Sequence, residues 1–141
     1  MSRLISFAFL LLFSPFFIAG SCNKDEKKKK CDPKVACTMM FASVSITVKT
    51  SNGVSAELDE VYTIRKSTSE ILKYSQPGNT TGAYIVLDDS YQKELQNKQE
   101  EFYFVGKKNG KVMVEEPYVL SADCCHVSKV SGRDALIISS Q

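Results

Sequence analysis

Two residue types are scarce or absent in this chain of 141 residues, and the scarcity excludes whole classes of site. There is no tryptophan, and His126 is the only histidine, which excludes a zinc site with two histidine ligands and a relay of two histidines. The net charge is only +2, so the chain lacks the basic footprint of a nucleic-acid-binding protein. A (β/α)₈ barrel enzyme is also excluded, because that fold needs roughly 250 residues.

The one long hydrophobic run lies at the N-terminus. Residues 4–18 are apolar apart from two serines and Pro15; they follow Arg3 and precede the small residues 19–21. This order is typical of a secretory signal peptide, and we predict one at residues 1–21. The alternative is a permanent membrane helix, but the apolar run is shorter than the roughly 20 residues that span a bilayer.

Cys22 follows the small residues directly. Residues 18–22 (IAGSC) resemble a bacterial lipobox, although Ala19 stands where a larger aliphatic residue is usual. The resemblance implies that the chain is cut before Cys22 and that the Cys22 thiol is lipidated. Because each buried CH₂ contributes about 0.8 kcal/mol, more than one acyl chain would anchor the protein stably to a membrane.

Residues 22–30 contain no apolar side chain after Cys22 and are expected to form a charged tether. Lys24, Asp25 and Glu26 resemble the surface-export signal of lipoproteins from the Bacteroidota. That resemblance implies a lipoprotein of the outer membrane that faces the cell exterior. The four lysines at 27–30 have two interpretations, which are contact with anionic headgroups and a spacer that stays soluble.

Residues 31–141 are long enough for a single domain with its own core, and their pattern is mostly β. The short segments and turn signals predict an antiparallel β-sandwich of about seven strands, with one short helix possible. The predicted strand segments are 41–50, 58–65, 83–87, 101–105, 112–114, 118–120, 125–130 and 135–138.

Local signals refine this expectation. Tyr62 and Ile64 share one side of the second strand, and Tyr91 and Leu95 are spaced to place a short helix on the core. Residues 106–110 carry hairpin turn chemistry. Pro117 is expected to interrupt the chain, so that the next strand begins after it or lies at a sheet edge.

Two stretches of this domain carry a family resemblance. Residues 84–89 (YIVLDD) and 123–132 (DCCHVSKVSG) resemble transthyretin-like and carboxypeptidase-regulatory-like β-sandwiches. One branch of the transthyretin fold hydrolyses 5-hydroxyisourate with several histidines and a C-terminal Tyr-Arg-Gly-Ser signature. This chain has neither feature, so that activity is not expected here.

Four cysteines remain once Cys22 is assigned to lipid. Cys31 and Cys37 begin the domain, and Cys124 and Cys125 lie near its end. An even number in an exported protein predicts disulfides, with three possible pairings. Adjacent cysteines are strained when bonded to each other, and in a strand they point to opposite faces. We therefore predict that each early cysteine bonds to a late one.

The alternative for these residues is a metal or redox site formed by Cys124, Cys125 and His126. Their sulfur and nitrogen atoms suit zinc or copper. Three consecutive residues of a strand cannot all face one ion, however, so disulfides are favoured. We predict no metal and no cofactor.

No catalytic residues can be assigned. Asp123 and Ser128 lie near His126 in sequence, but neighbours in a strand do not have the geometry of a Ser-His-Asp triad. The acidic pairs at 88–89 and 115–116 are expected to be solvated. The predicted function is a non-enzymatic, lipid-anchored surface protein that binds a protein or glycan or serves as an accessory module. The alternative is an extracytoplasmic metal- or redox-handling protein.

Overall fold

The computed structural model describes residues 31–139, apart from residue 33 and residues 76–81. The predicted signal peptide, the lipidation site Cys22 and the export signal Lys24, Asp25 and Glu26 lie outside the described residues and stay predictions. Within the described part of the chain, no helix combines the length and the apolar character that crossing a membrane requires.

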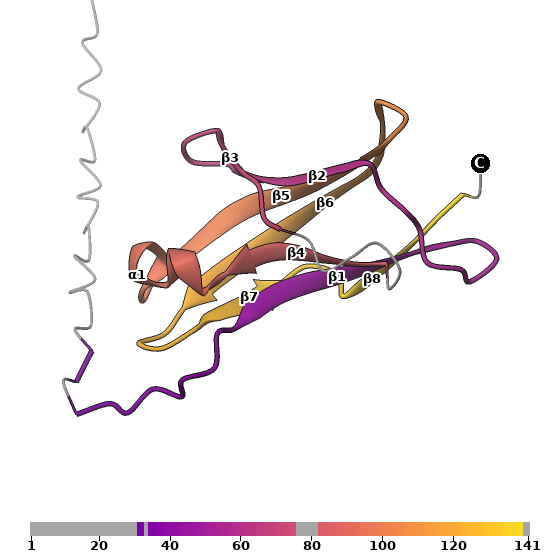
Figure 1. Ribbon diagram of the computed structural model, residues 1–141. Helices are drawn as coiled ribbons and strands as arrows, with labels where there is room; N and C mark the ends of the chain where they lie inside the picture. The colour runs from indigo at the N-terminus through magenta and orange to yellow at the C-terminus, as the bar shows by residue number, and fades with distance from the viewer. Residues whose placement is uncertain (1–30, 33, 76–81, 140–141) are drawn as a thin grey trace, which may run out of the picture.

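The domain is all-β, as predicted, and forms a sandwich of two sheets (Figure 1). One sheet has the strand order β4-β1-β8, and the other has the order β3-β2-β5-β6-β7. The elements are β1 (Ser43–Thr50), β2 (Glu60–Arg65), β3 (Glu70–Leu72), β4 (Ala83–Asp88), the 3₁₀ turn η2 (Asp89–Tyr91), α1 (Gln92–Leu95), β5 (Gln99–Lys108), β6 (Lys111–Ala122), β7 (Val127–Ser131) and β8 (Ala135–Ile138).

The core lies between the two sheets. On β1, Val44, Ile46 and Val48 are buried while their neighbours face outward, which confirms the predicted alternation. The short helix α1 is confirmed as well, because Leu95 is fully buried and Tyr91 packs against the core. The three-residue strand β3, which pairs with β2 at the sheet edge, carries too weak a pattern to have been predicted.

The buried face of β2 is a finding that the sequence pattern did not provide. Tyr62 and Ile64 share a side, as predicted, but they are only half-buried. Thr63 and Arg65 on the opposite side are buried instead. The Thr63 hydroxyl donates a hydrogen bond to the carbonyl of Val86 at 2.7 Å, which satisfies its polar group inside the sandwich.

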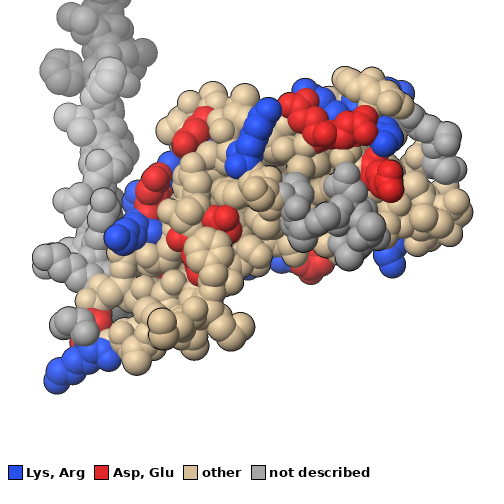
Figure 2. Space-filling model, viewed as in Figure 1, with Lys and Arg blue, Asp and Glu red and all other residues tan. Residues whose placement is uncertain are grey.

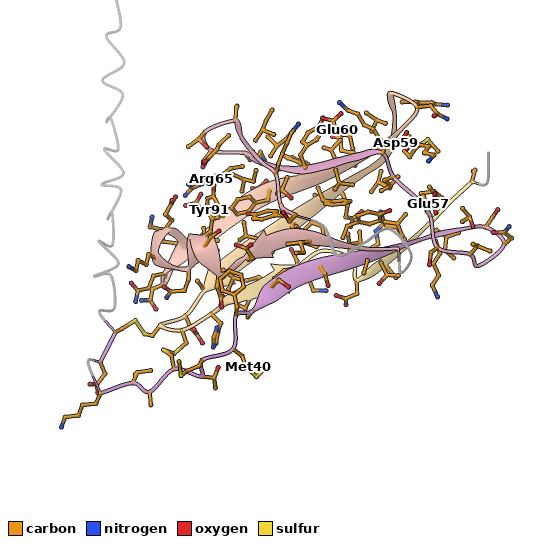
Figure 3. The ribbon with its side chains drawn as sticks, viewed as in Figure 1. Met40, Glu57, Asp59, Glu60, Arg65 and Tyr91 are labelled. Carbon is orange, nitrogen blue, oxygen red and sulfur yellow. A yellow bond between two sulfur atoms is a disulfide. The ribbon has the colours of Figure 1, made fainter. Side chains whose placement is uncertain are left out.

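Arg65 is buried because carboxylates meet its guanidinium group. It donates to both oxygens of Glu100, at 2.7 and 2.9 Å, and to Glu94 of α1 at 2.6 Å. The hydrogen bond from Arg65 is the main cause that holds the pKa of Glu100 below its ordinary value. Figure 3 shows Arg65 beside Tyr91, at the end of the sandwich that carries α1. This cluster therefore joins α1 to β2 and β5.

The β5–β6 hairpin is longer and tighter than predicted. Its strands continue through the expected loop at 106–110, and the turn is made by Asn109 and Gly110, with φ angles of 50° and 74°. Positive φ at both positions defines a type I′ turn, which Asn-Gly favours. The pairing register shifts between Gly106 and Lys107, so a β-bulge absorbs the extra residue.

Pro117 does not interrupt the chain. It lies inside β6, opposite Tyr103 of β5. Pairing between β6 and β7 begins only at Val119, so the missing N–H of Pro117 falls where β6 has an open edge. The prediction of a new strand after Pro117 is therefore wrong. Its alternative, an edge position for residues 118–120, is wrong as well, because Val119 and Leu120 pair with both β5 and β7.

The turn at residues 131–134 crosses from one sheet to the other. It leads from β7 to β8, which lies parallel to β1, so the sandwich is not purely antiparallel. Gly132 makes this crossing possible, because its φ is +125° and a Cβ there would lie 2.3 Å from the ring of Tyr118. The Tyr118 hydroxyl donates to the carbonyl of Arg133 at 2.6 Å and holds the turn against the core.

Candidate functional site

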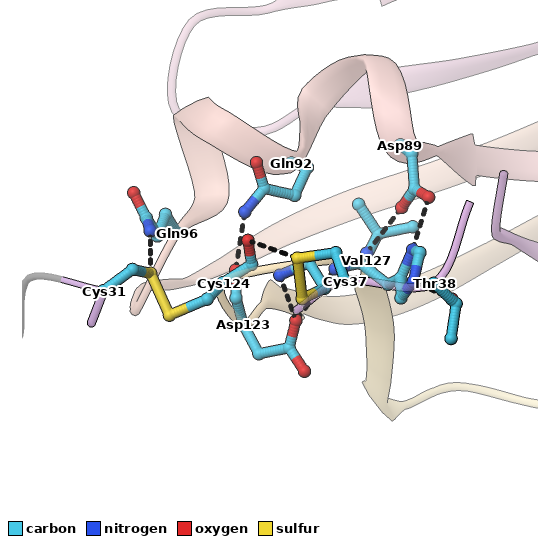
Figure 4. Close-up of a disulfide and its surroundings, with 11 residues drawn as sticks. Cys31, Cys37, Thr38, Asp89, Gln92, Gln96, Asp123, Cys124 and Val127 are labelled. Atoms are coloured by element: carbon cyan, nitrogen blue, oxygen red, sulfur yellow. Dashed lines mark hydrogen bonds and ion pairs between the residues drawn. A yellow bond between two sulfur atoms is a disulfide. The ribbon is translucent and has the colours of Figure 1, made fainter. Parts of the chain in front are cut away.

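Two disulfides join the N-terminal segment, residues 31–42, to the connection between β6 and β7. Cys31 is bonded to Cys124 and Cys37 to Cys125, with Cα atoms 5.5 and 5.3 Å apart (Figure 4). This confirms the predicted pairing of early with late cysteines. The alternative metal site with Cys124 and Cys125 as ligands needs free thiolates, which sulfurs in disulfides do not supply. Among the described residues, no cluster of three or more His, Cys, Asp or Glu is placed to hold a metal ion.

The local backbone explains how two adjacent cysteines both reach the N-terminal segment. Cys124 and Cys125 lie in a bend after β6, not within a strand as predicted, so their side chains are not restricted to opposite faces. Side chains near α1 support the bend. The Gln96 amide donates to Sγ of Cys31, and the Gln92 amide donates to the carbonyl of Asp123 at 2.7 Å (Figure 4).

His126, directly after the disulfides, binds two parts of the chain that are distant in sequence. Its Nδ1 lies 2.7 Å from Oδ2 of Asp89, and its Nε2 lies 2.8 Å from Oγ1 of Thr38. The same Asp89 carboxylate accepts the backbone N–H of Ala42 at 2.7 Å and that of Val127 at 2.8 Å. One carboxylate thus joins η2, the N-terminal segment and the start of β7. We call Thr38, His126 and Asp89 the histidine clip.

The two aspartates beside His126 are held as carboxylates. Burial, the largest influence, would raise the pKa of Asp89, but hydrogen bonds from Ala42, His126 and Val127 outweigh it and lower that pKa. The pKa of Asp123 is lowered mainly by the backbone N–H of His126 and then by that of Cys125, at 2.8 and 2.7 Å. Negative charge therefore persists at this end of the domain in mildly acidic conditions.

Both acidic pairs differ from the expectation that they are solvated. The Asp89 side chain is only 10% exposed. Glu116 of the second pair is buried and forms an ion pair with Arg133, with 2.7 Å between Oε2 and Nη2. Glu115, its neighbour on β6, is exposed. Consecutive residues of a strand point to opposite faces, so only one Glu of that pair remains in solvent.

The histidine clip has the connectivity of a hydroxyl–imidazole–carboxylate relay, which orients a nucleophile in some hydrolases. Asp123 and Ser128 are near His126 in sequence, but the Asp123 carboxylate contacts His126 only at its backbone N–H. The imidazole ring contacts Asp89 and Thr38 instead. No sequence signal links these residues, because 37 and 88 positions separate them from His126. Since Asp89 also binds two backbone amides, we interpret the cluster as a structural clip that fixes the N-terminal segment.

A second feature lies at the opposite end of the sandwich from α1 and the disulfides. Figure 1 shows the β1–β2 connection, the β5–β6 turn and the end of β8 at this end. Residues of these segments line an open hollow of about 470 Å³. Its size and mixed lining are those of a site for a small ligand or for a side chain of a partner. The lining includes Val54, Ala56, Glu57, Lys108, Met113 and Ile138.

No protein-family model, curated protein or solved structure matches this chain. The resemblance to transthyretin-like domains therefore stays a prediction.

The two disulfides are expected to be strongly non-additive in stability. Cys31–Cys124 closes a loop with a sequence separation of 93, and once it is formed Cys37–Cys125 closes only a short ring. From loop-closure entropy, removal of either disulfide as a Cys→Ala pair should cost about 2–3 kcal/mol, and removal of both about 7 kcal/mol. Denaturant unfolding of the two pairs and the quadruple variant, all carrying Cys22→Ser, measures these costs.

Mass mapping of the same proteins checks the connectivity. The Cys37→Ala/Cys125→Ala variant should retain a Cys31–Cys124 link and contain no free thiol. A link from Cys31 to Cys125 in the unaltered domain, or costs that simply add, would contradict this arrangement.

Asp89→Asn should destabilise the domain by about 1–3 kcal/mol at neutral pH, because the amide offers a single acceptor oxygen to three donors. The pKa of Asp89 is below its ordinary value of 3.8. Its stabilising effect is therefore present above that value and is lost as the pH falls through the folded-state pKa. Unfolding curves of Asp89→Asn should lose part of this acid-dependent decrease. Asp88→Asn is the matched control, and an equal effect at both positions would contradict the special role of Asp89.

Proposed function

We propose that the chain is a non-enzymatic, lipid-anchored protein of the bacterial cell surface, whose β-sandwich is a binding or accessory module for a protein or a glycan. The observation that carries this proposal is the pair of disulfides. Disulfides of this kind form and persist in oxidising compartments outside the cytoplasm. They also fix the start of the domain at one end of the sandwich, so a tether that begins at Cys22 would leave the domain there.

The position of the hollow supports a binding role. It opens at the end of the sandwich away from the disulfides, so an anchored domain would present it toward the surroundings. Lys108 and Glu57 line it together with apolar side chains, a combination that suits polar ligands with an apolar face. The sandwich itself supplies a rigid frame, because its apolar side chains pack into one core and its buried charged groups form hydrogen bonds within the domain.

Anchoring and export can be tested in the cells that produce the protein. Cys22→Ser should abolish lipidation and either release the mature domain or leave the precursor uncut, as fractionation and mass measurement will show. Replacing Lys24, Asp25 and Glu26 with Ala should leave the protein lipidated but protected from protease added to intact cells. Replacing the lysines at 28–30 with Ala is the matched control. Processed Cys22→Ser protein that remains in the membrane fraction would reject the lipid anchor.

The binding role can be tested at the hollow. Val54 lines it and is 60% exposed, so Val54→Arg should obstruct the site without disturbing the core. Ile71→Arg is a matched control, because Ile71 is 58% exposed on β3 and does not line the hollow. On glycan arrays and displayed peptide libraries, ligands of the unaltered domain should bind Val54→Arg at least about tenfold more weakly, about 1.4 kcal/mol. The absence of any ligand, or equal loss in both variants, would reject this role.

A further inference from the structure

Exposed apolar side chains are concentrated on the N-terminal segment. Among the described residues, nine large apolar side chains are exposed, and four of them lie between positions 35 and 41. Met39 is fully exposed, Met40 is 77% exposed and Phe41 is 70% exposed, while Val35 is 47% exposed. Figure 2 shows this part of the molecule as a largely uncharged projection beside the end of the sandwich. Contiguous apolar surface of this kind marks an interaction site.

The histidine clip closes this apolar stretch into a short loop. Thr38 is held by Nε2 of His126 at 2.8 Å, and the N–H of Ala42 is held by Asp89 at 2.7 Å. His126 and Asp89 are bonded to each other, so residues 39–41 lie between two joined attachment points. The disulfide at Cys37 adds a covalent attachment just before the loop. Figure 3 shows Met40 on the outer side of this segment, away from the core between the sheets.

Fixing the loop matters for binding. A free chain end would lose conformational entropy when it docks, whereas a loop closed by a disulfide and hydrogen bonds has already lost most of that freedom. In the structure, Met39, Met40 and Phe41 are exposed and do not belong to the core cluster. Methionine and phenylalanine side chains then remain available to an external apolar phase.

The chain before the domain indicates which phase this is. At most about 3.5 Å per residue separates Cys31 from Cys22, so the domain lies within about 30 Å of any lipid on Cys22. The four lysines at 27–30 precede Cys31, and Lys34 is exposed on the segment itself. Apolar side chains next to basic ones are the combination by which peripheral segments bind an anionic lipid surface.

We infer that residues 39–41 insert into the interface of the lipid bilayer in which the protein is anchored and orient the domain on it. This inference rests on the proposed function for the position of the membrane, but the contact itself needs no lipid on Cys22. Insertion would place the disulfide end against the bilayer and turn the hollow away from it.

Vesicle binding by unlipidated protein tests the contact. The mature chain with Cys22→Ser should co-sediment with vesicles of phosphatidylethanolamine and phosphatidylglycerol. The variant Met39→Ser/Met40→Ser/Phe41→Ser should bind at least about tenfold more weakly, because it loses most of the apolar area that enters the lipid. A control with Ile71→Ser, Val112→Ser and Ile137→Ser removes exposed apolar side chains that line neither the loop nor the hollow, and it should bind like the parent. Unchanged thermal unfolding of both triple variants shows that they fold.

Four outcomes would overturn the inference. The first is equal vesicle binding by the two triple variants, and the second is no vesicle binding by the parent. The third is a loss of binding when the lysines at 27–30 are replaced with Ser, together with unchanged binding of the Met39–Met40–Phe41 variant. That result would assign the contact to the charge of the tether alone. The fourth is light scattering that shows a dimer formed through the loop, together with a monomer that does not bind vesicles. Lipidation of Cys22 is measured separately in cells, so failure of the anchor and failure of the loop remain distinguishable.

Discussion

The covalent closure of the N-terminal segment onto the β6–β7 connection is the constraint on which the rest of this end of the molecule depends. Among the described residues between 31 and 42, none belongs to a strand, and β1 begins only at Ser43. Hydrogen bonds alone would have to overcome the entropy of a free chain end to hold such a segment. Cys31–Cys124 and Cys37–Cys125 remove most of that entropy, whether or not the weaker contacts are present. Thr38 and Ala42 can then bind His126 and Asp89 at low further cost.

Each of three buried or nearly buried charged side chains in this sandwich has hydrogen-bond partners from other elements. Asp89, Arg65 and Glu116 lie at the margins of the core, and each meets partners that satisfy most of its hydrogen-bonding groups. A buried charge without such partners would be costly, so the positions of these residues depend on elements that arrive from elsewhere in the chain. Asp89 depends on β7 and the N-terminal segment, Arg65 on β5 and α1, and Glu116 on the turn before β8.

The two ends of the sandwich therefore differ in physical character. The disulfide end is cross-linked, carries the histidine clip and presents an apolar loop. The opposite end is formed by turns that surround an open hollow. A domain with a fixed base and an open far end is suited to display a binding surface at a set distance from its attachment. This difference in character links the proposed anchor, the proposed lipid contact and the proposed ligand site.

Sequence alone determined the features that depend on local chemistry. The alternation in β1, the all-β class, the helical turn with Leu95 and the four cysteines of residues 31–141 could all be read from the sequence. The pairing of early with late cysteines could be predicted too, because a disulfide between adjacent cysteines is strained. The Asn109-Gly110 pair carried the signal for its tight turn, although the predicted loop was drawn too long.

Tertiary structure decided the features that depend on which distant groups meet. Alternation shows that Tyr62 and Ile64 share a face of β2, but not that the face of Thr63 and Arg65 is the buried one. That choice follows from Glu100 and Glu94, which reach Arg65 only once β5 and α1 are in place. In the same way, His126 acquires Asp89 and Thr38 as partners only after the disulfides and the sheet pairing bring three remote segments together. A periodic pattern fixes relative side-chain direction, whereas burial and hydrogen-bond partners are properties of the assembled fold.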